Sequence, residues 1–143
     1  LEGVSRAGVI DAAAQLFHSA AGDEPLHLYL LLVAASVGLS AFIDNIPYVA
    51  AMLPVVQGVA ALMNGGAGIE PELFYFGLLT GATLGGNLTP VGASANIAAC
   101  GILRREGYEV SAGQFMRIGV PFTLMAVLTG YVLCWLFYAG LGV

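Results

Sequence analysis

The chain has 143 residues, of which 59% are hydrophobic and only 9% are charged, and its mean hydropathy is +0.89. A soluble domain of this size cannot bury so much apolar surface, so the composition predicts a membrane protein surrounded by the lipid bilayer. Four arginines, no lysine and nine acidic residues give a net charge of -5. Nucleic acid is excluded as a partner, because its backbone would require a basic patch.

The first half of the chain predicts three helical segments. Residues 1–22 carry apolar residues near helical spacing and predict an amphipathic helix at the membrane interface. Residues 26–42 are uncharged apart from His27 and predict a membrane helix. After a short interruption at residues 44–47, the apolar run continues to residue 63. By length alone, this interruption is either a tight turn at the far membrane face or the tip of a hairpin inside the membrane.

The next apolar run must contain a break. Residues 73–103 carry no charge, and a straight helix of that length would overshoot a hydrocarbon core of about 30 Å. Gly85 and Gly86 suit a helix C-terminus, whereas Thr89 followed by Pro90 suits the start of a second helix. Two half-helices are therefore predicted to meet near the bilayer midplane.

The last part of the chain predicts a polar connector at residues 111–117 and a transmembrane helix at residues 118–141. Arg104, Arg105 and Arg117 cluster in one short loop, while the other loops are acidic. The loop with the arginines is therefore expected in the cytoplasm, and the C-terminus outside.

Two stretches of the sequence resemble a known group of proteins. Residues 40–47 read Ser-Ala-Phe-Ile-Asp-Asn-Ile-Pro, and residues 81–96 read Gly-Ala-Thr-Leu-Gly-Gly-Asn-Leu-Thr-Pro-Val-Gly-Ala-Ser-Ala-Asn. Both are similar to the ion transporter superfamily, which includes divalent-anion/sodium symporters, arsenite permeases, NhaD-type sodium/proton antiporters and the P protein. The resemblance covers residues 26–142 and is strongest to the antiporter and P-protein branches. It departs at Tyr48, where related antiporters often carry a smaller residue.

The resemblance implies an all-α membrane protein built from two inverted repeats, of which residues 1–143 would be the C-terminal one, a single membrane domain. Residues 26–63 would then be a re-entrant helical hairpin, residues 73–103 a broken transmembrane helix and residues 118–141 the final transmembrane helix. Its partner would be the N-terminal repeat of the same transporter. We further expect a homodimer in a bacterial or archaeal plasma membrane and a small ion or anion as substrate.

Helix ends inside a membrane suggest an ion site. Carbonyl ends favour a cation, and N–H ends favour an anionic group. We assign a sodium site to residues that offer oxygen ligands: Ser40, Asp44, Asn45, Asn87, Thr89 and Ser94. Asn96 either completes this site or forms a hydrogen bond to a neighbouring helix.

Asp44 is the only carboxylate within the predicted membrane runs, and an intramembrane acid is a functional candidate. The alternative is a residue that caps the following helix at a wet membrane edge. Desolvation penalises a charged carboxylate, whereas a bound cation favours it. Sodium and a proton are therefore expected to compete for Asp44.

Together these features predict secondary active transport, with sodium/proton antiport as the leading activity. Export of arsenite or another anion, or sodium-coupled carboxylate symport, is the alternative, and a channel-like or structural membrane subunit is a hypothesis of a different class. The sequence has no Ser/His/Asp or Cys/His arrangement typical of catalysis. We therefore expect no enzyme activity and no cofactor other than sodium as the coupling ion.

Overall fold

The structure is a computed structural model that describes residues 8–22, 24–63 and 71–140. These residues form helices joined by turns and contain no strand, which confirms the predicted all-helical class. The helices are α2 (Val9–Ala21), α3 (Pro25–Ser40), α4 (Asn45–Met63), α5 (Glu72–Gly85), α6 (Ser94–Arg105) and α7 (Ala112–Trp135), which continues as the π-helical turn η1 (Leu136–Gly140). The first part of the predicted amphipathic helix, residues 1–7, lies outside the described residues.

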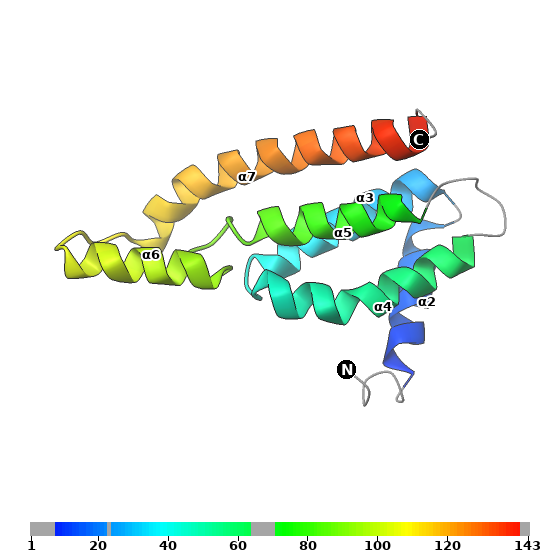
Figure 1. Cartoon of the computed structure of the whole chain (residues 1–143), viewed down its shortest axis with the longest axis horizontal. Helices are drawn as coiled ribbons and strands as arrows, with labels where there is room; N and C mark the ends of the chain where they lie inside the picture. Colours follow the sequence, from blue (N-terminus) through cyan, green and yellow to red (C-terminus); the bar gives the residue numbers. More distant parts are fainter. Residues whose placement is uncertain (1–7, 23, 64–70, 141–143) are drawn as a thin grey trace.

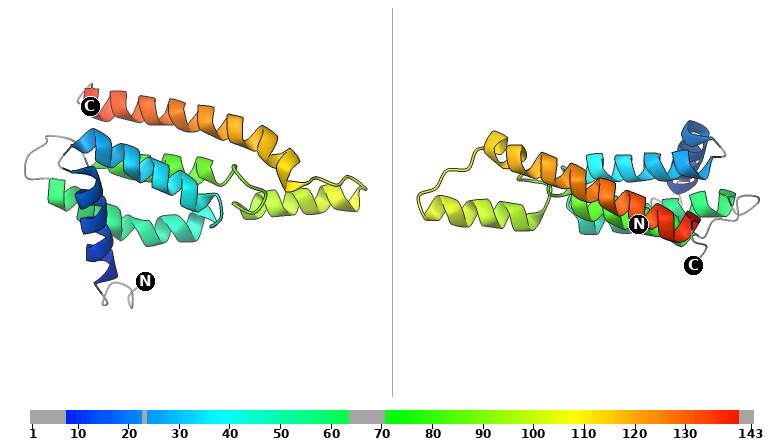
Figure 2. Two further views of the ribbon diagram at one scale, coloured as in Figure 1. Left: turned by 180° about the vertical axis from the view of Figure 1, so that it is seen from behind. Right: turned by 90° about the horizontal axis from the view of Figure 1, so that it is seen from above.

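The helices form an elongated molecule with its core at one end (Figure 1). Helices α3, α4 and α5 pack together, and α2 crosses α3 and α4 (Figure 2). Their shared core contains Leu28, Leu32, Val56, Phe74 and Leu78, all of which are fully or almost fully buried. Helix α6 continues from the end of α5, and α7 runs back along α5. The joint between α5 and α6 therefore lies in the middle of the molecule.

Small residues bring α5 close to α3. Gly77, Gly81 and Gly85 recur at four-residue intervals and face α3, the spacing that permits close approach of membrane helices. A Cβ atom added to Gly81 would lie 2.6 Å from Cβ of Ser36, and one added to Gly85 would lie 2.7 Å from Cα of Val37. The close packing of α5 on α3 therefore requires glycine, which has no side chain, at these three positions.

Helix α7 begins earlier than the sequence predicts. Ser111 caps it: the Ser111 hydroxyl accepts from the Gln114 N–H, while the Gln114 side chain accepts from the Ser111 N–H. This reciprocal capping box begins the helix at Ala112, so the predicted polar connector at residues 111–117 is wrong. The helical segment Ala112–Tyr138 has 27 residues and is long and apolar enough to cross a membrane.

Helix α6 begins later than the sequence predicts. Thr89 and Pro90 do not start it, because residues 89–93 form a turn in which the Gly92 N–H donates to the Thr89 carbonyl, at 3.3 Å. The first helical residue is Ser94, and Ala93 before it is extended. The physical reason is that the Thr89 hydroxyl donates to another segment, the carbonyl of Ala41, instead of capping its own helix.

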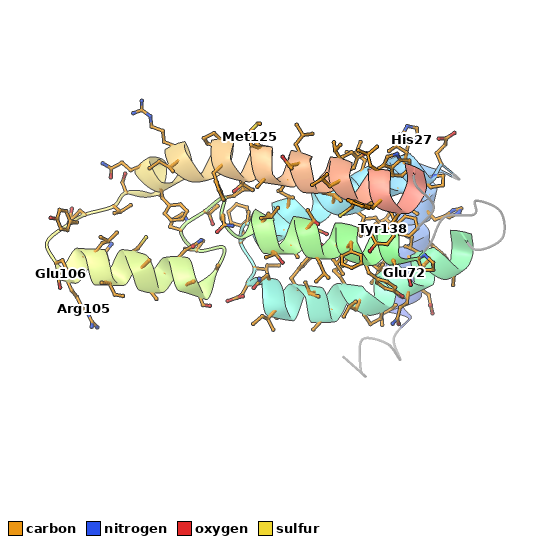
Figure 3. All side chains as sticks on the ribbon, turned by 45° about the horizontal axis from the view of Figure 1, so that its top comes forward. His27, Glu72, Arg105, Glu106, Met125 and Tyr138 are labelled. Atoms are coloured by element: carbon orange, nitrogen blue, oxygen red, sulfur yellow. The ribbon has the colours of Figure 1, made fainter. Side chains whose placement is uncertain are left out.

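The two ends of the molecule carry different residues. Figure 3 places His27, Glu72 and Tyr138 at one end, and Arg105 and Glu106 at the other. Since α5 begins at the first end and α6 finishes at the second, the two helices together extend over the length of the molecule.

Candidate ion-binding site

The turn between α3 and α4, which we call the tip, comprises residues 41–44. It is closed by its own backbone: the N–H of Ile43 donates to the Leu39 carbonyl at 3.0 Å, and the N–H of Tyr48 donates to the Asp44 carbonyl at 3.3 Å. These bonds leave the side chain of Asp44 available to other elements. The carbonyls at the end of α3 face the same region, with the partial negative charge of a helix C-terminus.

The segment between α5 and α6, which we call the connector, comprises residues 86–93. The connector contacts the tip at one point, and the start of α6 contacts it at a second. The hydroxyl of Thr89, which is 6% exposed, donates to the carbonyl of Ala41. The backbone N–H of Ser94, the first residue of α6, donates to Oδ2 of Asp44 at 3.2 Å. Residues far apart in the sequence thus hold the tip against the connector and the start of α6.

Three backbone carbonyls converge where the tip meets the connector. A Cβ atom added to Gly92 would lie 2.6 Å from the carbonyl oxygen of Gly86, 2.7 Å from that of Ala41 and 3.0 Å from that of Ser40. Ser40 is the last residue of α3, Ala41 follows it in the tip, and Gly86 directly follows α5. The point that they surround is one bond from the Cα of Gly92, so a side chain does not fit there. A cation could bind these oxygens only beside Gly92, as alkali cations bind carbonyl ends of broken helices in transporters. Sequence reasoning missed Gly92, although it lies within the stretch that resembles the superfamily.

Two candidate residues stabilise the surroundings of this group. Ser40 is completely buried, and its hydroxyl donates to the carbonyl of Ala82, which ties the end of α3 to α5. Nδ2 of Asn96 donates to the carbonyls of Gly86 at 2.9 Å and Thr89 at 3.1 Å. Asn96 therefore joins α6 to the connector, whereas the expected hydrogen bond was one to a neighbouring helix.

The remaining candidates lie around this contact. Asn45 lines a groove of about 330 Å³ between α4 and α5, beside Thr83. Asn87 lines a larger cleft of about 610 Å³ between α6 and α7. The structure therefore brings together Asp44, Thr89, Ser94 and Asn96, with Ser40 next to them, but it places Asn45 and Asn87 at two separate cavities.

A further contact links the two arms around the tip. Tyr48 is buried, and its hydroxyl donates to Oγ of Ser36 at 3.1 Å. The side chain of Tyr48 contacts α3 through this bond. It fixes the first turn of α4, and with it Asp44, relative to α3.

The charges and ligand types at this contact suit a hard monovalent cation. Asp44 supplies a carboxylate, and no lysine or arginine lies between Arg6 and Arg104 in the sequence. The positive partner of Asp44 is the N–H end of α6, where a helix dipole favours negative charge. Within the described residues, no group of three His, Cys, Asp or Glu side chains could hold a transition metal. The groups near this contact that could bind an ion are therefore carboxylate, hydroxyl and carbonyl oxygens.

The all-helical fold, the apolar composition and a helix long and apolar enough to cross a membrane are consistent with a membrane protein. The profile of the citrate transporter family (CitMHS), part of the ion transporter superfamily, matches residues 1–143. The chain belongs to this family. The predicted membership of the superfamily is therefore confirmed.

Several curated relatives match the chain. An uncharacterised transporter of Mycobacterium tuberculosis is 38% identical over 133 residues, which are 93% of this chain and 31% of the relative. The 46 kDa membrane protein of Mycobacterium leprae is 34% identical over 130 residues, covering 91% of this chain and 30% of that protein. The human P protein is 37% identical over 110 residues, which cover 77% of this chain and 13% of the P protein.

The chain spans about a third of the length of the mycobacterial relatives that it matches (31% and 30%). No solved structure matches the chain significantly.

Proposed function

We propose that the chain supplies one repeat of an ion-coupled secondary active transporter, with sodium/proton antiport as the activity. The contact between Asp44 and the N–H of Ser94, at 3.2 Å, carries the proposal. It connects the tip to the first residue of α6, so a ligand that binds Asp44 acts on both elements. Nearby carbonyls of the α3 and α5 ends offer further oxygen ligands for sodium.

The depth of the tip supports a site inside the membrane. The Asn87 carbonyl lies against Gly119 of α7, which is about 10 Å along the helix from Ala112 at 1.5 Å per residue. Gly119 follows Arg117 by two residues, so if α7 crosses the bilayer with Arg117 at the interface, the connector would lie just inside the hydrocarbon core. The tip contacts the connector and therefore lies at a similar depth.

The lengths of α3, α5 and α6 support the same topology, whereas α4, with 19 residues, is about long enough to span the core. Helix α3 has 16 residues and so extends about 24 Å, which is less than a hydrocarbon core of about 30 Å. Helices α5 and α6, with 14 and 12 residues, are shorter still. We therefore propose a re-entrant hairpin for α3 and α4, and a broken transmembrane helix for α5 and α6. A first repeat of the same protein would complete the site.

Competition at Asp44 would couple the two ions. A proton and a sodium ion both bind at carboxylate oxygens, so the side chain of Asp44 would hold one or the other. Sodium binding would then expel the proton, while the carbonyl oxygens and the Thr89 hydroxyl hold the ion. Because Asp44 also accepts from the N–H of Ser94, exchange of the two ions would change how α6 is held by the tip.

Sodium-coupled carboxylate symport is the second candidate, and the citrate transporter description of the family supports it. An anionic substrate would favour the N–H end of a helix. At the start of α6, however, Asp44 already accepts from the Ser94 N–H. This contact favours a cation or proton at the tip itself, and it is why we rank antiport above symport and above export of arsenite or another anion.

Flux in vesicles tests the proposal. The full-length parent protein is reconstituted, and proton flux driven by a sodium gradient is followed across a pH series, with citrate gradients measured in parallel. We expect sodium-driven proton flux in the parent and its loss in Asp44→Asn, which keeps the shape but cannot titrate. Citrate uptake that depends on sodium, without proton exchange, would select symport. Conductance without coupling would refute both.

A further inference from the structure

Helix α7 contains a buried polar group that the packing of the helices does not explain. Thr123 is completely buried, and among the residues that the structure describes its Oγ1 is a buried side-chain oxygen with no hydrogen-bond partner. Thr129 on the same helix differs, because it is exposed and its hydroxyl donates to the Met125 carbonyl at 2.8 Å. A buried hydroxyl without a partner is costly, so the position of Thr123 indicates a ligand.

Thr123 faces the end of α5. Helix α7 packs along α5, and two of its glycines show how the helices are aligned. A Cβ atom added to Gly130 would lie 2.7 Å from Cγ2 of Thr80, and one added to Gly119 would lie 2.5 Å from the carbonyl oxygen of Asn87. Residues 119, 123 and 130 share one face of α7, because four- and seven-residue steps return to the same side of a helix. Thr123 therefore lies between these two contacts, opposite the last turn of α5 and the start of the connector.

The backbone groups at this place offer carbonyl oxygens. Helix α5 ends at Gly85, and the carbonyls of a helix C-terminus carry the negative end of its dipole. Two connector carbonyls also face α7, since a Cβ atom added to Gly119 would lie 2.5 Å from the oxygen of Asn87 and 3.5 Å from that of Leu88. Carbonyl oxygens at an interrupted helix hold sodium in transporters, and a threonine hydroxyl oxygen is a ligand of the same hard type.

This place is separate from the contact at the tip. Asp44 meets the start of α6, and Thr89 meets the end of α3, whereas Thr123 approaches the connector from α7. The cleft of about 610 Å³ is lined by Asn87 and by Gly119 and Phe122 of α7. It therefore reaches the connector next to Thr123, and neither Asp44 nor Thr89 lines it.

We propose that Thr123 is a ligand of a second sodium site, which it forms with carbonyl oxygens of the connector and of the α5 end. The inference deepens the proposed function, on which it rests for the choice of sodium as the ion. All ligands of this second site are neutral oxygens, so an ion that binds there displaces no proton. The two sites therefore differ in a measurable way: sodium at Asp44 releases a proton, and sodium at Thr123 does not.

Sodium binding to the purified full-length parent protein tests the second site. Radioactive sodium bound per chain at saturation is measured for the parent and for Thr123→Val, whose side chain has nearly the same shape but no hydroxyl. We expect Thr123→Val to bind one sodium ion fewer per chain and to release protons on sodium binding as the parent does. Thr123→Ser, which keeps the hydroxyl, should bind the parental number of ions. Thr129→Val is the matched control and should also bind the parental number, because it removes an exposed hydroxyl from the same helix.

Several results would overturn the inference. Equal binding by the parent and Thr123→Val would mean that the hydroxyl has another partner, such as a water molecule. Loss of an ion in Thr123→Ser or in Thr129→Val would remove the link to the Thr123 hydroxyl, and loss of proton release in Thr123→Val would merge this site with that of Asp44. If Thr123→Val does not fold, Thr123→Ala gives the same comparison. A parent protein that binds sodium without releasing protons would refute antiport at Asp44, yet the difference between the parent and Thr123→Val would still decide the second site.

Discussion

Replacing Gly92 by alanine is expected to force apart the tip and the connector. The added Cβ would lie 2.6 Å from the carbonyl oxygen of Gly86 and 2.7 Å from that of Ala41. The backbone of Gly92 does not have a positive φ, so alanine can adopt its conformation and the effect is purely steric. Both oxygens belong to backbone, which cannot rotate away as a flexible side chain would.

The size of the effect follows from these distances. Ordinary contact begins at about 3.4 Å, so the Ala41 carbonyl must retreat by about 0.7 Å and the Gly86 carbonyl by slightly more. Overpacking of this kind costs about 1–3 kcal/mol. If this cost falls on the arrangement that binds the ion, it lowers sodium affinity by about 5- to 150-fold.

The assay is the sodium dependence of transport by the parent protein in vesicles, together with thermal unfolding of the same sample in detergent. Gly38→Ala is the matched control, because a Cβ atom at Gly38 meets nothing within 4 Å, and it should keep the parental half-saturating sodium concentration. A folded Gly92→Ala protein with parental sodium dependence would refute the assignment of the carbonyl group to the ion site.

Three further predictions concern packing, the tip and orientation. Gly85→Ala should lower the unfolding temperature relative to Gly38→Ala, because its Cβ would meet the α3 backbone at 2.7 Å; equal temperatures would contradict the packing of α5 on α3. Thr89→Val removes the hydroxyl that bonds the tip, leaves a buried carbonyl unpaired at a cost of about 1–3 kcal/mol, and should weaken sodium affinity without abolishing flux; unchanged affinity would exclude Thr89. Cysteines at Arg105 and Glu72 should be labelled by an impermeant reagent from opposite faces, and labelling from one face would disprove the topology.

The fold class and most helices could be predicted because they depend on local properties of the sequence. The apolar composition predicts a membrane protein, and the long uncharged runs predict where its helices lie. Helix α5 ends at Gly85, where glycines lower the cost of leaving the helix. The start of α7 was placed too late, because the Ser111 and Gln114 capping box extends the helix through a polar segment.

Contacts between distant residues could not be predicted in this way. Thr89 has the composition of a helix cap, yet its partner is Ala41, 48 residues away. For Asp44, sequence reasoning weighed an ion ligand against a cap of the helix that follows it. The side chain does meet a helix N-terminus, but that of α6, 50 residues later in the chain. Hydrophobic periodicity carries no information on such pairs.

Proton release on sodium binding tests the role of Asp44 most directly. Sodium is added to the purified full-length parent protein in weakly buffered detergent solution, and the pH change is recorded at several starting pH values. Competition at one carboxyl group predicts acidification by up to about one proton per bound sodium, and Asp44→Asn should release none. Equal proton release from the parent and Asp44→Asn would contradict the assignment of ion coupling to the contact between the tip and α6.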